Sequence, residues 1–281
     1  MTVGRVTAVA WPRQAGLAVA LADAADRAPP FLGIGALPDR PIRLILAPTR
    51  AAFDSLTRGG LPSWSEGVAY PDAGTVVLLT AGPPHRLAAA LRHELAHLAL
   101  RWRVRRFLPL WFEEGYAAVA AGEWDRLDAL RLNWQVARGV RMNLDDLDRA
   151  LRSDRVEAGS AYALASTAVL LLDRWGRGGG GGGGGAGGLE LLIGNLAREP
   201  TFDAALRVTY HVTEDDFETR WQRDVATRYG WLSWAGAAGL FWAAAGLLLV
   251  WLVRVRRRRD RARKALLDEG WTLPPEDDQT A

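Results

Sequence analysis

The sequence predicts an α+β protein with a small N-terminal β-sheet, a mainly helical remainder and one transmembrane helix. Three observations lead to this prediction. Segments with strand character lie within the first 80 residues, and apolar residues recur at helical spacing from residue 84 onward. Residues 231–253 then form an uncharged run long enough to cross a bilayer as a helix.

Composition and charge narrow the possible functions. The 281-residue chain contains no cysteine, which excludes a disulfide framework, a thiolate metal site and a cysteine nucleophile. Its net charge of +3 arises from residues 254–264, which hold eight basic residues and one acid, whereas residues 1–230 are about neutral. Because the folded part has no basic excess, we expect no nucleic-acid partner.

The N-terminal segment, residues 1–30, begins without a strand or helix pattern over residues 1–14. Residues 15–28 are rich in alanine, with Leu17, Leu21 and Ala24 at helical spacing, and predict a helix that packs on the domain. The alternative is a short export signal, since Arg5 and Arg13 precede the apolar run 15–22.

Strand signals follow. Residues 41–48 read as a strand bounded by prolines, and residues 50–58 as a short helix ended by two glycines. Residues 64–70 and 74–80 flank a Pro-Asp-Ala-Gly turn sequence and predict a β-hairpin. Its second strand, 75–80, is the more apolar.

Helical signals dominate the rest. The first predicted helix, residues 84–101, carries a stripe of leucines every three or four residues. Further helices are expected at 109–121, 124–138, 144–152, 160–175, 189–198, 201–209 and 214–229. Residues 178–188 are almost pure glycine and lack the spacing and lysine of a phosphate loop, which indicates a low-complexity polyglycine insertion.

The chemistry is concentrated in an H-E-x-x-H motif on the first of these helices. His93 and His97 are four residues apart and share a helix face, so that both imidazoles can bind one metal ion, with Glu94 beside them. The helix at 109–121 adds Glu113 and Glu114, which spacing does not separate. Two imidazoles, a carboxylate and an open position form a catalytic zinc site; the alternative is a pair of surface histidines beside a glutamate.

These segments resemble a known family. His93-Glu94-Leu95-Ala96-His97, followed by Leu-Pro-Leu-Trp-Phe-Glu-Glu-Gly-Tyr-Ala at 108–117, is similar to the gluzincin metallopeptidases, and more closely to bacterial peptidase MA-like domains. The resemblance implies a thermolysin-like zinc peptidase domain over residues 31–230. It also implies that the third zinc ligand is Glu114, the glutamate before the glycine.

The resemblance further implies how a substrate is handled. An extended peptide would pair along the strand that precedes the active helix, residues 75–80. A downstream tyrosine or histidine would stabilise the oxyanion, and Tyr162 is the candidate; the alternative is a core tyrosine with a satisfied hydroxyl. The expected activity is hydrolysis of a peptide or protein substrate by a zinc-activated water, with Glu94 as general base and acid.

Two other functions compete with this expectation. Intramembrane metalloproteases also use H-E-x-x-H, but the motif helix carries four arginines and is not a membrane span. A non-catalytic, membrane-tethered binding module could retain the fold, although the complete ligand set and Glu94 argue against it.

The final prediction concerns the membrane. Residues 231–253 carry Trp231, Trp234 and Trp251 near their ends and are followed at once by the basic run. We expect this segment to contact membrane lipid as a single-pass helix in the cell membrane. Residues 1–230 would then be extracytoplasmic, and residues 254–281 would form a cytoplasmic tail.

Overall fold

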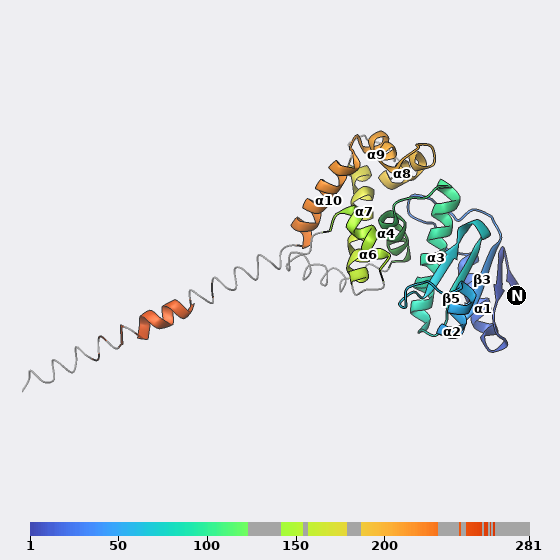
Figure 1. Ribbon diagram of the computed structural model, residues 1–281, viewed down its shortest axis with the longest axis horizontal. Coiled ribbons are helices and arrows are strands. Elements are labelled where there is room, and N and C mark those ends of the chain that lie inside the picture. The colour runs from blue at the N-terminus through green and yellow to red at the C-terminus, as the bar shows by residue number, and fades with distance from the viewer. Residues whose placement is uncertain are drawn as a thin grey trace, which may run out of the picture. The chain divides into compact units, whose positions relative to one another are not determined.

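The computed structural model describes residues 1–122, 142–153, 157–178 and 187–229, together with residues 242, 246–254, 256–257, 259 and 261. The chain divides into two compact units, Met1–Gly230 and Trp231–Ala281. The first unit is an α+β structure in which a small sheet precedes most of the helices (Figure 1).

The sheet has five strands in the order β1-β2-β3-β5-β4. The strands are β1 (Thr2–Val3), β2 (Val6–Val9), β3 (Ile42–Ala47), β4 (Gly67–Tyr70) and β5 (Thr75–Leu79). β2, β3 and β5 are parallel, whereas the two edge strands, β1 and β4, pair antiparallel to their neighbours. The predicted hairpin is therefore present as β4 and β5.

Successive side chains of a strand point to opposite faces of the sheet, and both faces of this sheet are apolar. Val76 and Leu78 of β5 face the main core with α1 (Ala15–Asp26) and α3 (Pro84–Val104), whereas Val77 and Leu79 pack against Phe53 of α2 (Arg50–Thr57). The sheet is thus covered by α2 on one face and by α1 and α3 on the other. Short 3-10 turns, Pro12–Gln14 and Pro71–Ala73, precede α1 and β5.

The helices after α3 form the second part of the unit (Figure 1). They are α4 (Leu110–Ala121), α6 (Leu144–Leu151), α7 (Glu157–Gly178), α8 (Gly188–Leu196), α9 (Phe202–Tyr210) and α10 (Glu214–Tyr229). Each lies within a few residues of a predicted helix. The helix expected at 124–138 lies outside the described residues, as does most of the polyglycine run, 179–186.

Packing at Gly115 brings α4 and α7 unusually close together. A Cβ atom at Gly115 would lie 2.5 Å from the carbonyl oxygen of Ala165 and 3.1 Å from Val169 Cγ2. The first distance is too short for a Cβ atom and the second is tight, so glycine at this position permits the two backbones to approach. The start of α4 is held from another direction, because the N–H groups of Leu110 and Trp111 donate to the carboxylate of Asp148 on α6.

The sheet departs from the sequence prediction in two places. Residues 1–14 contain β1 and β2, which are too short to show a pattern. β2 pairs with β3, and its Val6 and Ala8 are buried in the main core together with residues of α1. The strand expected to offer its edge to a substrate, residues 75–80, is β5, which lies between β3 and β4 and has no free edge. The free edge on this side belongs to β4.

The predicted transmembrane helix is corrected. In the part of the chain that the structure describes, every helix falls short, in length or in apolar character, of what crossing a bilayer requires. Residues 231–241 and 243–245 of the expected span 231–253 lie outside the described residues.

The prediction of an α+β fold with a small sheet and mainly helices is therefore confirmed, and the prediction of a transmembrane helix is wrong. The expected single-pass localisation in the cell membrane, with an extracytoplasmic domain and a cytoplasmic C-terminus, is corrected on the same finding.

Candidate metal centre

The two histidines of the motif lie on one face of α3. Their rings are 5.0 Å apart between centroids, as expected for residues one turn apart on a helix. The opposite face of α3 is buried, with Leu91, Leu95 and Leu98 in the main core. Core packing therefore fixes the rotation of α3, which turns both imidazoles away from the core leucines.

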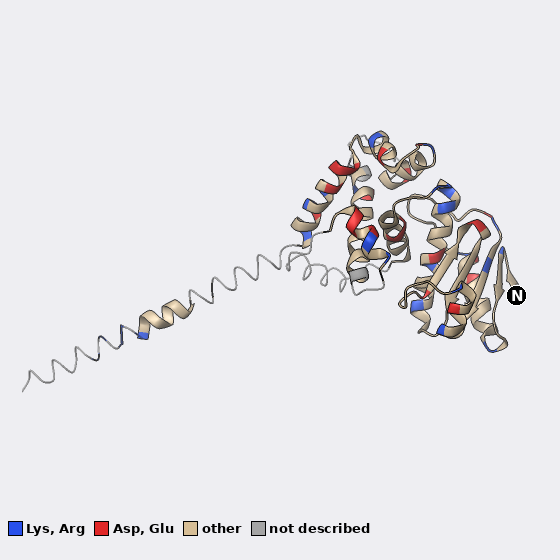
Figure 2. Ribbon diagram, in the orientation of Figure 1, with Lys and Arg blue, Asp and Glu red and all other residues tan. Residues whose placement is uncertain are grey.

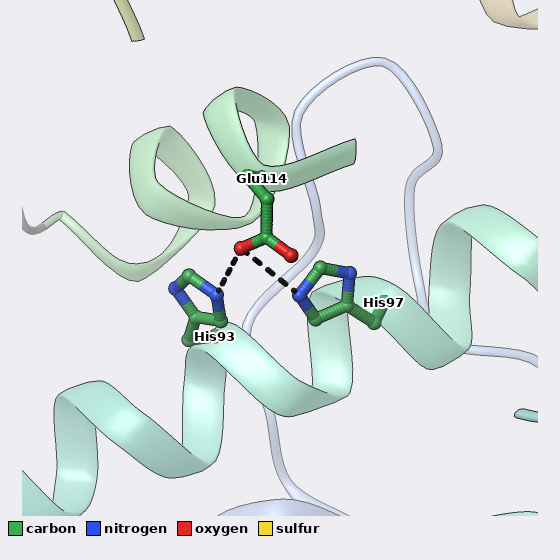
Figure 3. A group of neighbouring side chains, drawn as sticks. All are labelled: His93, His97 and Glu114. Atoms are coloured by element: carbon green, nitrogen blue, oxygen red, sulfur yellow. Dashed lines mark ion pairs between the residues drawn. The ribbon is translucent and has the colours of Figure 1, made fainter. Parts of the chain in front are cut away.

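Glu114 of α4 meets the two imidazoles. Its Oε2 lies 3.4 Å from His93 Nε2 and 3.8 Å from His97 Nε2 (Figure 3). Each of the three residues offers one ligand atom, and these three atoms lie within 4.8 Å of one another. This His/His/Glu group can therefore hold a metal ion. The three side chains converge from two helices, as Figure 3 shows.

The charge state of Glu114 suits a ligand. Burial by itself raises the pKa of this carboxyl, but the charge of His97, the contact with His93 and a hydrogen bond from Tyr162 outweigh burial and lower the pKa to about 2. Glu114 is therefore a carboxylate at neutral pH, the form that binds a cation.

Its neighbour Glu113 has a different role. The Glu113 Oε1 accepts a hydrogen bond from the Leu108 N–H at 3.3 Å, which ties it to the segment before α4. Burial raises the pKa of Glu113, partly offset by this hydrogen bond. Spacing in the sequence left the two glutamates equivalent, whereas the structure brings only Glu114 to the histidines.

Glu94 is buried between α3 and β4, with 7% of its surface exposed. A Cβ atom at Gly67, the first residue of β4, would lie 2.6 Å from Glu94 Oε1 and 2.8 Å from its Cγ. The carboxylate thus occupies the space that a side chain on Gly67 would need. The sequence contains no motif that singles out Gly67; its importance comes from this contact alone.

Tyr162 of α7 also reaches the group. Its hydroxyl donates a hydrogen bond of 3.0 Å to Glu114 Oε2, and its ring lies 6.4 Å from that of His93 and 5.4 Å from Trp64, between centroids. The predicted site residues, His93, Glu94, His97, Glu114 and Tyr162, are therefore gathered in one place.

The group lies in a cleft of about 1340 Å³. One wall is α3 with the start of α4, and the facing wall is the segment 60–69, which leads into and includes most of β4. Arg50 braces that segment by donating to the carbonyl oxygens of Ser63, at 2.8 Å, and Ser65, at 2.7 Å.

Among the described residues, the outer edge of β4 faces no other strand. The Leu79 N–H donates to the Glu66 carbonyl at 2.8 Å, and Gly67 is paired with Leu78. In an antiparallel ladder hydrogen-bonded pairs alternate with non-bonded ones, so Gly67 and Ala69 direct their N–H and C=O groups to the outer edge. The Gly67 carbonyl additionally accepts from Ser65 Oγ at 2.8 Å.

Comparison with known proteins adds no family assignment: no protein-family model matches the chain, and no curated protein matches its sequence. The geometry of the site is therefore the basis for a function.

Proposed function

We propose that this protein is a zinc-dependent peptidase. The observation that carries the proposal is the meeting of His93, His97 and Glu114 in a cleft where a second, buried carboxylate, Glu94, adjoins them. Two imidazoles and one carboxylate with an open position are the donor set of catalytic zinc in hydrolases. Nitrogen and oxygen donors without thiolate also suit this borderline ion.

A zinc ion bound there would act as a Lewis acid that acidifies water and polarises a carbonyl group. The chain itself would handle the protons. Glu94 would accept a proton from the attacking water at its carboxylate and deliver it to the leaving amine. Its burial against Gly67 limits the positions that the carboxylate can take, which is the preorganisation that such proton transfer needs.

Tyr162 supports the site in this proposal. Its hydroxyl holds Glu114 in place and lies beside the cleft, where it could turn from Glu114 to the oxyanion that forms on the substrate carbonyl. The alternative, a core tyrosine with a satisfied hydroxyl, also accounts for this hydrogen bond, because the Tyr162 ring packs against the main core.

The substrate is a peptide because the wall that faces the metal group is a strand edge. Gly67 and Ala69 direct backbone groups outward, and an extended peptide can add to them as a further strand. This pairing would bring a peptide bond close to Glu94, since Gly67 contacts that side chain. β4 takes the place that the sequence assigned to residues 75–80.

The test uses the purified full-length chain. We expect about one equivalent of zinc by elemental analysis, cleavage of a casein digest, and loss of cleavage after chelation. Glu94→Gln should keep the zinc and lose about 10²- to 10⁴-fold in cleavage rate, since general acid–base catalysis is of this size.

Other results would redirect the proposal. Absence of bound metal would refute it. Iron in place of zinc would indicate an oxygenase-type centre, because two histidines and a carboxylate also hold Fe(II). Zinc without any cleavage would favour a non-catalytic binding module.

A further inference from the structure

The cleft continues past the metal group along α3. His93, His97 and Arg101 follow one another at four-residue spacing, and all three line the cleft. Figure 2 shows basic residues gathered at the C-terminal end of this helix. The cleft therefore passes from the metal donors to a cationic end within one further helical turn.

Within the described residues, Arg101 interacts electrostatically with the carboxyl of Glu113, and its one ion pair is a long one to Asp72. Its Nη1 is buried and makes no hydrogen bond to the described residues. Its Nε is 3.9 Å from Asp72 Oδ1, too far for a hydrogen bond, and the Asp72 side chain is 92% exposed, so solvent weakens the pair. A buried guanidinium donor without a partner is costly, which favours a ligand that supplies an acceptor.

The guanidinium also stacks on an aromatic ring. Its central carbon lies 4.2 Å from the ring centroid of Phe107, whose own surface is 87% exposed. Stacking on an aromatic ring orients the planar fork of a guanidinium without using its N–H groups. Those groups match the geometry of a carboxylate, which can accept two parallel hydrogen bonds.

A basic residue near a helix C-terminus has a simpler explanation, since it offsets the helix dipole. Arg103 illustrates this case: it lies in the same last turn, is exposed, and does not line the cleft. Arg101 differs in lining the cleft, in its buried nitrogen and in its aromatic support. The pair of arginines therefore provides a matched comparison.

The direction of β4 gives the position that Arg101 would recognise. β4 begins at Gly67 beside Glu94, and just after its end the Pro71 carbonyl accepts a hydrogen bond of 2.8 Å from Trp102 Nε1, next to Arg101. A peptide that pairs antiparallel with β4, the more stable arrangement, has its N-terminal residues at the Arg101 end. One helical turn from His97 is about 6 Å, or about two residues of extended peptide.

We propose that Arg101 binds the carboxylate of an acidic side chain about two residues before the scissile bond, so that the cleft selects acidic peptides. This inference rests on the proposed peptidase function for the term "scissile bond", but the carboxylate site itself can be tested by binding alone.

The probe is a randomised decapeptide library applied to the immobilised, zinc-loaded, full-length Glu94→Gln variant. Retained peptides are sequenced by mass spectrometry. We expect Asp and Glu to be enriched about tenfold over Asn and Gln, as for a charge-assisted hydrogen bond in a partly buried site. Adding Arg101→Gln should abolish the enrichment, Arg101→Lys should keep part of it, and Arg103→Gln should leave it unchanged.

Zinc content and melting temperature are measured for every variant, so that a folding defect is separated from loss of recognition. Acid enrichment that survives Arg101→Gln, or a parent protein that retains no acidic peptides, would overturn the inference. The same library incubated with the wild type tests the peptidase function separately. Retention of acidic peptides without cleavage would refute only the peptidase proposal, and cleavage without acid preference would refute only the Arg101 site.

Discussion

The two walls of the cleft differ in what they present. The wall formed by α3 and α4 presents side chains, namely two imidazoles and carboxylates that meet at the metal group. The facing wall, around β4, presents backbone, namely the outward N–H and C=O groups of Gly67 and Ala69. In the proposed peptidase, the helical wall would supply the reactive groups and the strand edge would bind the substrate. Reactive groups must be of defined residue types, whereas a strand edge can have almost any sequence.

The walls are also supported differently. The helical wall depends on close packing, with Gly115 of α4 against α7 and Asp148 of α6 binding the first N–H groups of α4. The strand wall depends on its ladder with β5 and on the bonds from Arg50 to the preceding segment. They meet where Glu94 lies against Gly67, and Arg86 of α3 also donates to Glu66 at 3.3 Å. Changes at each place should therefore separate metal binding, catalysis and stability.

The largest expected effect is a loss of zinc affinity when a residue of the helical wall is changed. Glu114→Gln removes a charged donor from the metal group, whereas Glu113→Gln alters a side chain bound to the Leu108 N–H. We expect zinc affinity to fall by more than about 100-fold in the first variant, since loss of an outer-shell partner alone costs 10–100-fold. The second should change it only a few-fold.

A competition titration with a zinc chelator measures both affinities. Equal losses in the two variants would show that the two glutamates are not distinguished by the site.

The second largest expected effect is a loss of catalytic rate when Gly67, at the contact between the two walls, is changed. Gly67→Ala places a methyl group in the space of the Glu94 carboxylate, which must move. A displacement of about 1 Å at a catalytic group can cost about 100-fold, so kcat should fall by roughly that amount with zinc content unchanged. Gly82→Ala is the control, because a Cβ atom at Gly82 meets nothing within 4 Å.

Steady-state kinetics on a peptide substrate measure kcat for Gly67→Ala and Gly82→Ala, and melting temperatures show whether either variant is destabilised. A Gly67→Ala protein with wild-type kcat would show that the carboxylate does not need this position.

The smallest expected effect is a loss of stability when the packing between α4 and α7 is changed. Gly115→Ala forces α4 away from α7, and overpacking of this kind costs about 1–3 kcal/mol in the free energy of unfolding. Gly159→Ala, in α7 at a place with open space around it, should instead be neutral or stabilising by up to about 1 kcal/mol, because alanine favours helix. Urea denaturation of the two variants provides the comparison; similar stabilities would mean that the helices are not in close contact.

The sequence predicted the helices from α3 to α10 that the structure describes because their apolar periodicity is strong. It predicted the short strands poorly. β1 and β2 have two and four residues, and such segments become strands only through pairing. The uncharged run at 231–253 was interpreted as a membrane helix from length and composition alone, and the described structure does not provide such a helix.

The sequence by itself predicted which residues of the helical wall can hold a metal ion. H-E-x-x-H has mechanistic meaning because four residues is about one turn, so that His93 and His97 share a face on any helix. The motif resemblance implied Glu114 rather than Glu113, but only the tertiary structure brought Glu114 to the histidines, placed Tyr162 against its carboxylate and gave the free edge to β4. These features depend on the packing of segments distant in the chain, and no local pattern encodes that packing.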